Sequence, residues 1–255
     1  MRKIELSTWE SVPQKLESLK RSLEIIYEVR LETDSLDIEL DRLYPTEDFL
    51  ENDKLALVFL KVVTEGYDAP IIAVERGTDY FVLDGHHRSY IYRKLMKKTI
   101  KAEILRFPHG AKYRDVPRSS LEDLPIREVA PIDNLILQAW GRILKILKQY
   151  EALYHIPFYM KKKQVALKDL SPTQPEVLKT QIEAISRLLV PIACIEYDEK
   201  HYVLDGHARC LRAKQLALKS IQTIVLLPLM HVDFGIVKTA KEMKLESLQD
   251  VAVID

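Results

Sequence analysis

Two pentapeptides in this chain combine residue types that could bind an anionic ligand. The first is Asp-Gly-His-His-Arg at residues 84–88, and the second is Asp-Gly-His-Ala-Arg at residues 205–209. Glycine lets a backbone approach a ligand closely, and arginine presents a planar fork that suits phosphate oxygens. Histidine can donate or carry a proton near neutral pH, and aspartate can cap a helix or hold a cation such as Mg²⁺. Together these residue types indicate a site for phosphate groups, most simply those of a nucleotide.

The first pentapeptide lies where a predicted strand meets a predicted helix. The apolar run 80–83 ends at Asp84, and the apolar spacing that follows predicts a helix over 89–97. A helix N-terminus presents unpaired N–H groups and a partial positive charge, both of which favour phosphate. We therefore predict a nucleotide-binding set of Gly85, His86, His87 and Arg88. The second pentapeptide supplies a candidate anion-binding set of Asp205, Gly206, His207 and Arg209.

A further candidate lies upstream, in the tripeptide Pro45-Thr46-Glu47. The pattern predicts a helix from about Thr46 to Val63, with Thr46 as its N-cap. Glu47 would then lie in the first turn, where a carboxylate stabilises the helix dipole. A carboxylate at a phosphate site can also act as a general base. The residues alone favour the first interpretation and leave the second open.

The pentapeptides belong to a longer internal repeat. They lie 121 residues apart, and the same offset relates Ala-Pro-Ile at 69–71 to Val-Pro-Ile at 190–192. An offset of 127 relates Pro45 to Pro172, and also relates Ser-Leu-Glu-Asp at 120–123 to Ser-Leu-Gln-Asp at 247–250. Because the matching segments keep their order, we predict an internal duplication. The expected domains are residues 1–132 and residues 133–255, each an α+β module with a small mixed sheet and flanking helices.

Composition narrows the class of protein. The chain of 255 residues carries 38 Lys and Arg against 38 Asp and Glu, so no basic excess points to a nucleic-acid partner. No apolar run is long enough for a membrane span, and the first residues lack the apolar core of a secretory signal. Its two cysteines indicate neither a disulfide framework nor a metal site. These features predict a cytoplasmic protein.

The order of these motifs resembles the ParB/sulfiredoxin superfamily: a Pro-x-Glu/Gln segment, an apolar strand, a second strand, and a Gly-x-x-Arg turn that opens a helix. Residues 36–105 are most similar to the archaeal free serine kinases, which share Asp-Gly-His-His-Arg and the glutamate of Pro-x-Glu. Sulfiredoxins have a reactive cysteine where this chain has His86, and chromosome-partitioning proteins have Gly-Glu-Arg-Arg. The second module stands where those kinases have a different domain that lines the substrate pocket.

The resemblance implies a nucleotide-dependent kinase that phosphorylates a small hydroxyl compound, as the serine kinases convert L-serine to O-phosphoserine. It implies ATP or ADP, with Mg²⁺, as the nucleotide. Glu47 would be the general base, and Asp84 would cap the loop or contact Mg²⁺. Arg88, the two histidines and the backbone after Gly85 would hold the phosphates. The expected catalytic residues are Glu47, Asp84 and His87.

The second copy departs from the first at two of these positions. Gln174 replaces Glu47, and Ala208 replaces His87. Since glutamine cannot accept a proton as a base, we expect the second module to serve as a scaffold or a binding unit. Two alternatives to a kinase stay open: a ParB-like nucleic-acid-binding protein or nuclease, and a nucleotide-binding module without chemistry. No pattern in the sequence predicts the acceptor, the preferred nucleotide or the oligomeric state.

Overall fold

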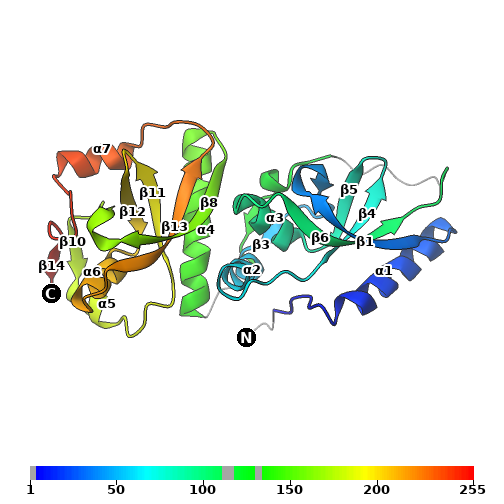
Figure 1. The fold of residues 1–255 in the computed structure, drawn as a ribbon, viewed down its shortest axis with the longest axis horizontal. Helices are drawn as coiled ribbons and strands as arrows, with labels where there is room; N and C mark the ends of the chain where they lie inside the picture. Colours follow the sequence, from blue (N-terminus) through cyan, green and yellow to red (C-terminus); the bar gives the residue numbers. More distant parts are fainter. Residues whose placement is uncertain (1–3, 111–117, 130–133) are drawn as a thin grey trace. The chain divides into compact units, whose positions relative to one another are not determined.

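The computed structural model describes residues 4–110, 118–129 and 134–255. The chain forms two compact units, Met1–Gln138 and Ala139–Asp255 (Figure 1). The domain boundary expected at 132/133 falls outside the described residues. Within the described ranges, no helix combines the length and the apolar character that a membrane span needs.

The first unit is built on a five-stranded mixed sheet with the strand order β1-β6-β4-β5-β2. The pairs β1/β6 and β4/β5 are antiparallel, whereas β4/β6 and β2/β5 are parallel. A separate parallel pair joins β3 to β7. The elements are α1 (Val12–Tyr27), β1 (Glu32–Glu39), β2 (Leu43–Tyr44), β3 (Leu50–Glu51), α2 (Asn52–Glu65), β4 (Ile71–Arg76), β5 (Asp79–Asp84), α3 (His86–Lys94), β6 (Thr99–Arg106) and β7 (Ile126–Arg127), with short 3₁₀ turns at Leu40–Arg42 and Leu121–Asp123.

The second unit has the same arrangement. Its five-stranded sheet has the order β8-β13-β11-β12-β9, with the same sequence of antiparallel and parallel pairs, and β10 pairs with β14 as β3 pairs with β7. The elements are α4 (Leu135–Tyr154), β8 (Phe158–Ala166), β9 (Leu170–Ser171), β10 (Glu176–Leu178), α5 (Lys179–Glu183), β11 (Ile192–Tyr197), β12 (Lys200–Asp205), α6 (His207–Gln215), β13 (Ser220–Pro228), α7 (Gly235–Glu242) and β14 (Ala252–Ile254), with a 3₁₀ turn at Leu167–Asp169.

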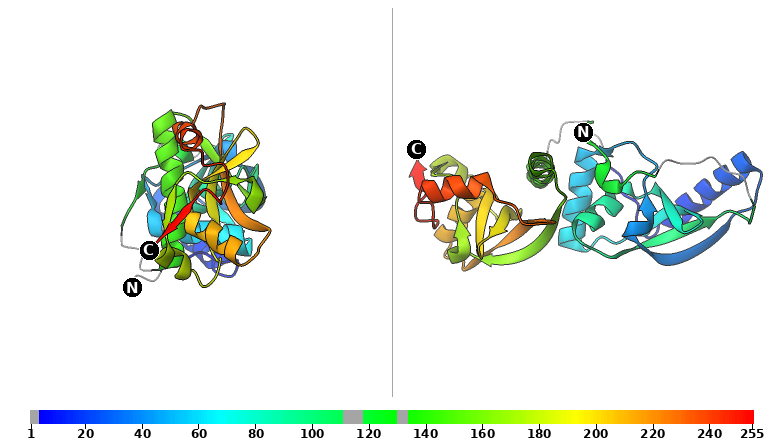
Figure 2. Two further views of the ribbon diagram at one scale, coloured as in Figure 1. Left: turned by 90° about the vertical axis from the view of Figure 1, so that its left-hand side faces the viewer. Right: turned by 90° about the horizontal axis from the view of Figure 1, so that it is seen from above.

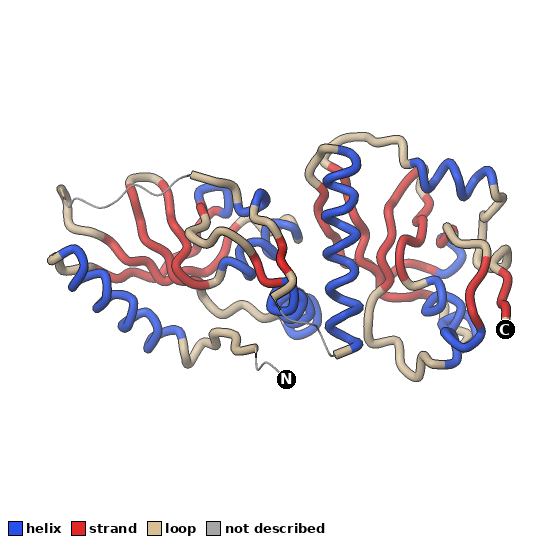
Figure 3. The backbone as a smooth tube through the Cα atoms, turned by 180° about the vertical axis from the view of Figure 1, so that it is seen from behind, coloured by secondary structure: helices blue, strands red, loops and turns tan. Residues whose placement is uncertain are grey.

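The fold class expected from the sequence is confirmed, because each unit is a small mixed sheet with flanking helices (Figures 2 and 3). Two similar sheets are what two tandem modules would give. The origin of the units by duplication stays a prediction.

In the first unit, helices cover both faces of the sheet. The buried strand β4 turns alternate side chains to opposite faces. Ile72 and Val74 belong to the core cluster that includes Val12 of α1. Ile71, one position away, faces the start of α3, where its Cγ2 lies beside Gly85. The sheet thus separates α1 from α3, and the end of β5 brings Asp84 to their common edge.

Two predicted helix starts are corrected by the structure. The helix predicted from Thr46 begins only at Asn52, because the hydroxyl of Thr46 donates to the carbonyl of Val82 and so does not cap a helix. Residue 47 therefore lies in a loop. The helix predicted from Ser89 already begins at His86, because Gly85 takes a left-handed φ of 105° and turns the chain directly from β5 into α3.

Candidate functional site

A pocket of the first unit contains every residue predicted there for nucleotide binding or catalysis. Its wall comes from the start of α3, the loop before β3, the helices α1 and α2, and the segment that precedes α1. The lining residues are Glu5, Leu6, Ser7, Lys15, Glu47, Lys54, Val58, Tyr67, Asp84, Gly85, His86, His87 and Arg88.

The turn from β5 into α3 requires glycine at its centre. Besides the left-handed φ of Gly85, a Cβ built there would lie 2.5 Å from Cγ2 of Ile71 and 2.9 Å from Nη2 of Arg88. Real Cβ atoms do not approach other heavy atoms so closely, so a side chain would force the strand and the helix apart. The glycine therefore brings the backbone of α3 close to β4 and leaves room for the folded-back arginine.

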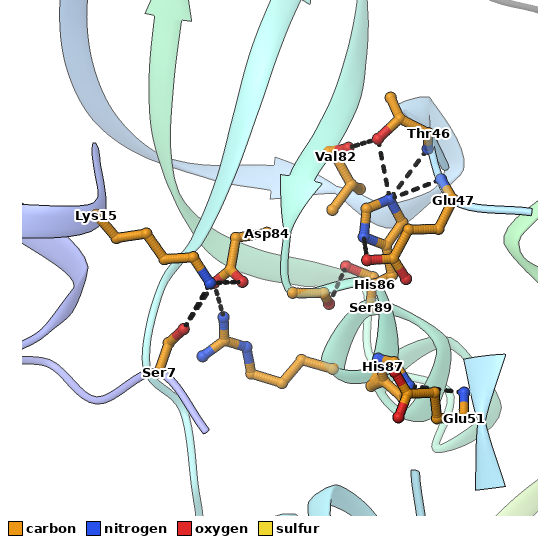
Figure 4. A network of polar contacts seen from close by, with 12 residues as sticks. Ser7, Lys15, Thr46, Glu47, Glu51, Val82, Asp84, His86, His87 and Ser89 are labelled. Carbon is orange, nitrogen blue, oxygen red and sulfur yellow. Dashed lines mark hydrogen bonds and ion pairs between the residues drawn. The ribbon is translucent and has the colours of Figure 1, made fainter. Parts of the chain in front are cut away.

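Asp84 joins three elements through its carboxylate. The hydroxyl of Ser7 donates to it at 2.8 Å, and the ammonium of Lys15 forms an ion pair with it (Figure 4). Nη2 of Arg88 lies 3.3 Å away. Burial alone would raise the pKa of Asp84, but the contacts with Lys15, Ser7 and Arg88 lower it below its usual value. Asp84 is therefore ionised at neutral pH and ties the N-terminal segment and α1 to α3.

These partners do not fit the predicted contact between Asp84 and Mg²⁺. Both carboxylate oxygens already face donors, Lys15 at one oxygen and Ser7 and Arg88 at the other. Among the described residues, no group of three or more His, Cys, Asp or Glu side chains could hold a metal ion. A cation at Asp84 would have to displace the ammonium of Lys15, so Asp84 acts as the partner of two basic side chains.

Arg88 lies in the pocket wall with only 3% of its side chain exposed, and its partners hold it in place. Its Nη1 donates to the hydroxyl of Tyr67 at 2.7 Å, and the guanidinium lies over the Tyr67 ring at 5.3 Å from the ring centre. The tyrosine hydroxyl in turn donates to the carbonyl of Ser7 at 2.5 Å. No motif indicated Tyr67, which lies 21 residues before Arg88 and contacts it only in the folded unit.

His86 is buried and anchors a loop. Its Nε2 accepts the backbone N–H of Thr46 at 3.0 Å and that of Glu47 at 3.3 Å (Figure 4). This nitrogen is thus turned away from a phosphate at the helix start and toward the loop. The predicted phosphate contact of His86 could come only from its Nδ1, which faces Glu47 at 3.3 Å.

His87 has a similar internal bond, since its Nε2 accepts the backbone N–H of Glu51 at 3.0 Å. Burial, followed by the charge of Lys54, lowers the pKa of His87 to about 3. The imidazole is therefore neutral at physiological pH. It cannot supply a positive charge to a phosphate, and Nδ1 is the ring nitrogen left to donate a hydrogen bond.

Glu47 lies in the pocket wall with 46% of its side chain exposed. Burial raises the pKa of its carboxyl, but the side-chain contact with His86 and the positive charge of Lys54 outweigh burial, and the pKa falls below its usual value. The carboxylate is thus ionised and open to a ligand. Lys54 entered no sequence prediction, because the expected helix start at Thr46 placed the first turn of α2 too early.

The second unit repeats the junction but not the full pocket wall. Gly206 has a φ of 106°, and Nη2 of Arg209 donates to Asp205 at 2.6 Å. His207 Nε2 accepts the N–H of Thr173 at 3.0 Å, and the Thr173 hydroxyl donates to the carbonyl of Val203 at 2.6 Å. The second-unit residues predicted to bind an anion, Asp205, Gly206, His207 and Arg209, thus lie together and contact one another or their own unit.

Each unit also has a basic side chain on its first helix that faces the aspartate of the pentapeptide. Arg142 of α4 lies 3.6 Å from Asp205, as Lys15 of α1 pairs with Asp84. In contrast, α2 has 14 residues, whereas its counterpart α5 has 5. The position of Lys54 corresponds to Gln181 when the prolines at 45 and 172 are aligned.

Comparisons with known proteins match this chain only in part. No family model matches it. An uncharacterized protein of Methanocaldococcus jannaschii is 30% identical over 122 residues, which are 45% of this chain and 45% of that protein. This chain therefore spans less than half the length of the curated relative that it matches.

Three solved structures show weak likenesses. Sulfiredoxin from Arabidopsis thaliana is 21% identical over 28% of this chain and 83% of its own, with a TM-score of 0.24. A free serine kinase variant in complex with ADP is 14% identical over 82% of this chain and 81% of its own, with a TM-score of 0.25. The Agrobacterium tumefaciens protein Atu1540 is 14% identical over 37% of this chain and 62% of its own, with a TM-score of 0.29. Scores this low establish no shared function, and superfamily membership stays a prediction from the motifs.

Proposed function

We propose that the first unit binds the phosphates of a nucleotide at the start of α3 and transfers a phosphoryl group to the hydroxyl of a small molecule. The observation that carries this proposal is one pocket in which an ionised, half-exposed carboxylate, Glu47, shares the wall with a helix N-terminus and three basic side chains, Lys15, Lys54 and Arg88. Phosphoryl transfer needs this combination of positioning, charge neutralisation and a proton acceptor.

Phosphate binding would use the backbone first. The leading N–H groups of α3 have no partner within the helix, and the N-cap residue, Gly85, has no side chain to cap them. They carry the positive end of the helix dipole into the pocket. Lys54 lines the same pocket as Glu47 and His87 and supplies a full positive charge there. Arg88 and Lys15 add further donors at the opposite wall, where Asp84 holds them in place.

The transfer step places Glu47 as the general base. The oxygen of the acceptor hydroxyl attacks the terminal phosphorus of the nucleotide and forms the new P–O bond. The bond from that phosphorus to the bridging oxygen breaks, and the nucleotide leaves with one phosphate fewer. The hydroxyl proton passes to the Glu47 carboxylate. ATP or ADP can supply the group by the same chemistry, and neither asks for a metal ligand from this chain.

The second unit does not catalyse in this proposal. Gln174 stands at the position of Glu47 and cannot take a proton. The units, taken as residues 1–132 and 133–255, would be tandem modules of the ParB/sulfiredoxin type, of which the first reacts and the second supports it.

The test is ³¹P NMR of the full chain with ATP or ADP, a magnesium salt and a panel of small hydroxyl compounds that includes serine. We expect a phosphomonoester signal that grows with time. Glu47→Gln should slow its appearance by about 10²- to 10⁴-fold while nucleotide binding, measured by calorimetry, persists. The matched control is Gln174→Ala at the equivalent position of the second unit, which should change neither measurement.

Two outcomes would contradict the proposal. Nucleotide that binds but stays intact with every acceptor would leave a binding module without chemistry. A product signal that persists at full rate in Glu47→Gln would remove Glu47 from the mechanism.

A further inference from the structure

We infer that His86 is a positioning residue: a neutral imidazole, protonated on Nδ1, that fixes the Pro45-Thr46-Glu47 loop to α3 and holds the Glu47 carboxylate over the pocket. The consequence for the reaction rests on the proposed function, whereas the arrangement of His86 itself does not. The sequence pattern had instead placed His86 among the phosphate contacts.

The backbone contacts determine which ring nitrogen carries the proton. Nε2 of His86 lies 3.0 Å from the backbone N of Thr46 and 3.3 Å from that of Glu47. Backbone N–H groups only donate, so Nε2 must accept, and the single proton of a neutral imidazole then lies on Nδ1. If both ring nitrogens were protonated, the N–H at Nε2 would face the backbone N–H groups of Thr46 and Glu47, donor against donor. The ring is buried and cannot avoid this repulsion by turning toward water.

Thr46 completes the attachment of the loop. Its hydroxyl donates to the carbonyl of Val82 on β5, while the same oxygen lies 3.3 Å from Nε2 of His86. The hydroxyl proton is thus directed to the strand and the backbone N–H to the helix. With two points of attachment on either side of the strand-to-helix turn, the backbone at residue 47 has little freedom, so the direction of its side chain is set by the fold.

The second nitrogen of His86 faces the carboxylate. Nδ1 lies 3.3 Å from Oε1 of Glu47, in a contact that lacks the geometry of a hydrogen bond. The imidazole is 1% exposed, and no other polar atom of the described residues satisfies Nδ1. A buried N–H without an acceptor is unfavourable. Because Oε1 of Glu47 is the acceptor that this N–H faces, movement of the carboxylate toward His86 would complete the hydrogen bond, and movement away would leave the N–H without an acceptor.

The second unit has the loop attachment without the carboxylate. His207 accepts the N–H of Thr173, and Thr173 donates to Val203, so the loop attachment is complete. The following residue is Gln174, so a neutral amide takes the place of the carboxylate. The attachment thus serves the fold in both units, and only the first adds an acid to it.

Three groups surround Glu47, one of them charged, and all must be considered when Glu47 is titrated. His86 and His87 face it from α3, and Lys54 faces it from α2. The test therefore measures the tautomer of His86 and the titration of Glu47 separately, in addition to the rate of transfer.

The first measurement uses the wild-type chain with ¹⁵N-labelled histidine. The His86 signals, assigned by their loss in His86→Gln, should show Nδ1 protonated and Nε2 unprotonated at neutral pH. The opposite tautomer, or an imidazolium at neutral pH, would overturn the inference. This measurement needs no functional assay. If His86→Gln does not fold, the His86 signals can instead be assigned by their selective broadening near a paramagnetic label on an exposed residue.

The second measurement uses His86→Gln, whose side-chain carbonyl can still accept from the loop but offers no Nδ1–H to Glu47. In chain labelled with ¹³C at the glutamate carboxyls, the pKa of Glu47 should rise toward that of an ordinary glutamate. The rate of phosphoryl transfer should fall roughly 10- to 100-fold, the range typical of a misplaced reactive group, while nucleotide affinity is kept. His207→Gln is the matched control and should leave the titration of Glu47 unchanged.

An unchanged titration of Glu47 in folded His86→Gln would overturn the positioning role. If the wild-type chain transfers no phosphoryl group, the proposed function fails, but the tautomer and the titration still decide whether His86 holds Glu47.

Discussion

The two units have the same strand-to-helix junction but differ in what surrounds it. Each contains a left-handed glycine, an aspartate paired with the arginine four residues later, and a histidine that accepts a backbone N–H from the Pro-Thr loop. The three repeated side chains of the pentapeptide, those of Asp, His and Arg, therefore have partners inside their own unit. The comparison teaches that the repeated motif builds the junction, and that differences in function must come from the positions that are not repeated.

Those positions cluster on one side of the junction. Glu47, His87 and Lys54 of the first unit correspond to Gln174, Ala208 and Gln181 of the second. Val58 reaches the pocket from a part of α2 that has no counterpart in the second unit, because α5 ends after 5 residues. The two units thus share the junction, and only the first has Glu47 and Lys54 beside it.

The largest effect on stability is expected at the two glycines of the junctions. In Gly85→Ala and Gly206→Ala the new methyl group would lie 2.5 and 2.7 Å from Cγ2 of an isoleucine, and the left-handed backbone adds its own penalty. We expect each variant to destabilise its own unit by about 2–5 kcal/mol. Hydrogen exchange resolved by peptide measures the loss in each unit separately.

Gly77→Ala is the control for this prediction. Its φ is also positive, at 65°, but nothing lies within 4 Å of the added Cβ. The loss should therefore be only about 1 kcal/mol. Equal losses of stability in Gly77→Ala and Gly85→Ala would show that the close approach of residue 85 to Ile71 does not contribute to the cost.

Acid should destabilise both units through their buried histidines. Burial lowers the pKa of His87 to about 3 and that of His207 to about 4. In the unfolded state each histidine takes up a proton near pH 6.5, whereas in the folded unit it does not. The contribution of the neutral histidine to the free energy of unfolding is therefore fully present above pH 6.5 and is lost as the pH falls toward the folded-state pKa values. At pH 5 each histidine should cost about 2 kcal/mol.

Urea unfolding at pH 7 and pH 5, followed in each unit by hydrogen exchange, measures this loss. His87→Gln keeps an acceptor for the N–H of Glu51 but cannot be protonated, so the first unit should lose less stability between the two pH values while the second is unaffected. A first unit whose pH dependence is the same in His87→Gln would show that another group is responsible.

The smallest effect on stability is expected at Ser7, which lines the pocket of the first unit. Ser7→Ala removes the hydrogen bond to Asp84, while Lys15 and Arg88 still pair with that carboxylate. We expect a loss of about 0.5–1.5 kcal/mol in thermal or urea unfolding. Ser35→Ala removes an exposed hydrogen bond of similar length to Glu103 and should cost less. An equal or larger loss at Ser35 would argue against a structural role for the N-terminal segment at the pocket.

Much of the fold could be predicted from the sequence because local patterns determine it. The apolar runs of β4 and β5, the turn at Gly77 between them and the glycine before α3 are all local signals. The start of α2 was predicted wrongly because Thr46 resembles an N-cap, yet its hydroxyl is used by a strand that lies 36 residues away.

The candidate site was predicted less completely, since its wall is assembled by distant contacts. Glu47, Asp84 and the residues of the pentapeptide do line one pocket, as the motifs suggested. Lys15 and Tyr67 lie in segments without any motif and meet Arg88 or Asp84 only in the folded unit. The internal bonds of His86 and His87 were also missed, because a histidine in a sequence does not reveal which nitrogen is already occupied.

The loop attachment has a consequence for how such a protein can evolve. Since the histidine and the threonine hold the backbone, the side chain that follows the threonine is not needed for folding. A glutamate codon becomes a glutamine codon through one base change, which would remove the acid and leave the loop in place. After a gene is duplicated, one copy could therefore lose its reactivity in a single step and remain a stable partner to the other.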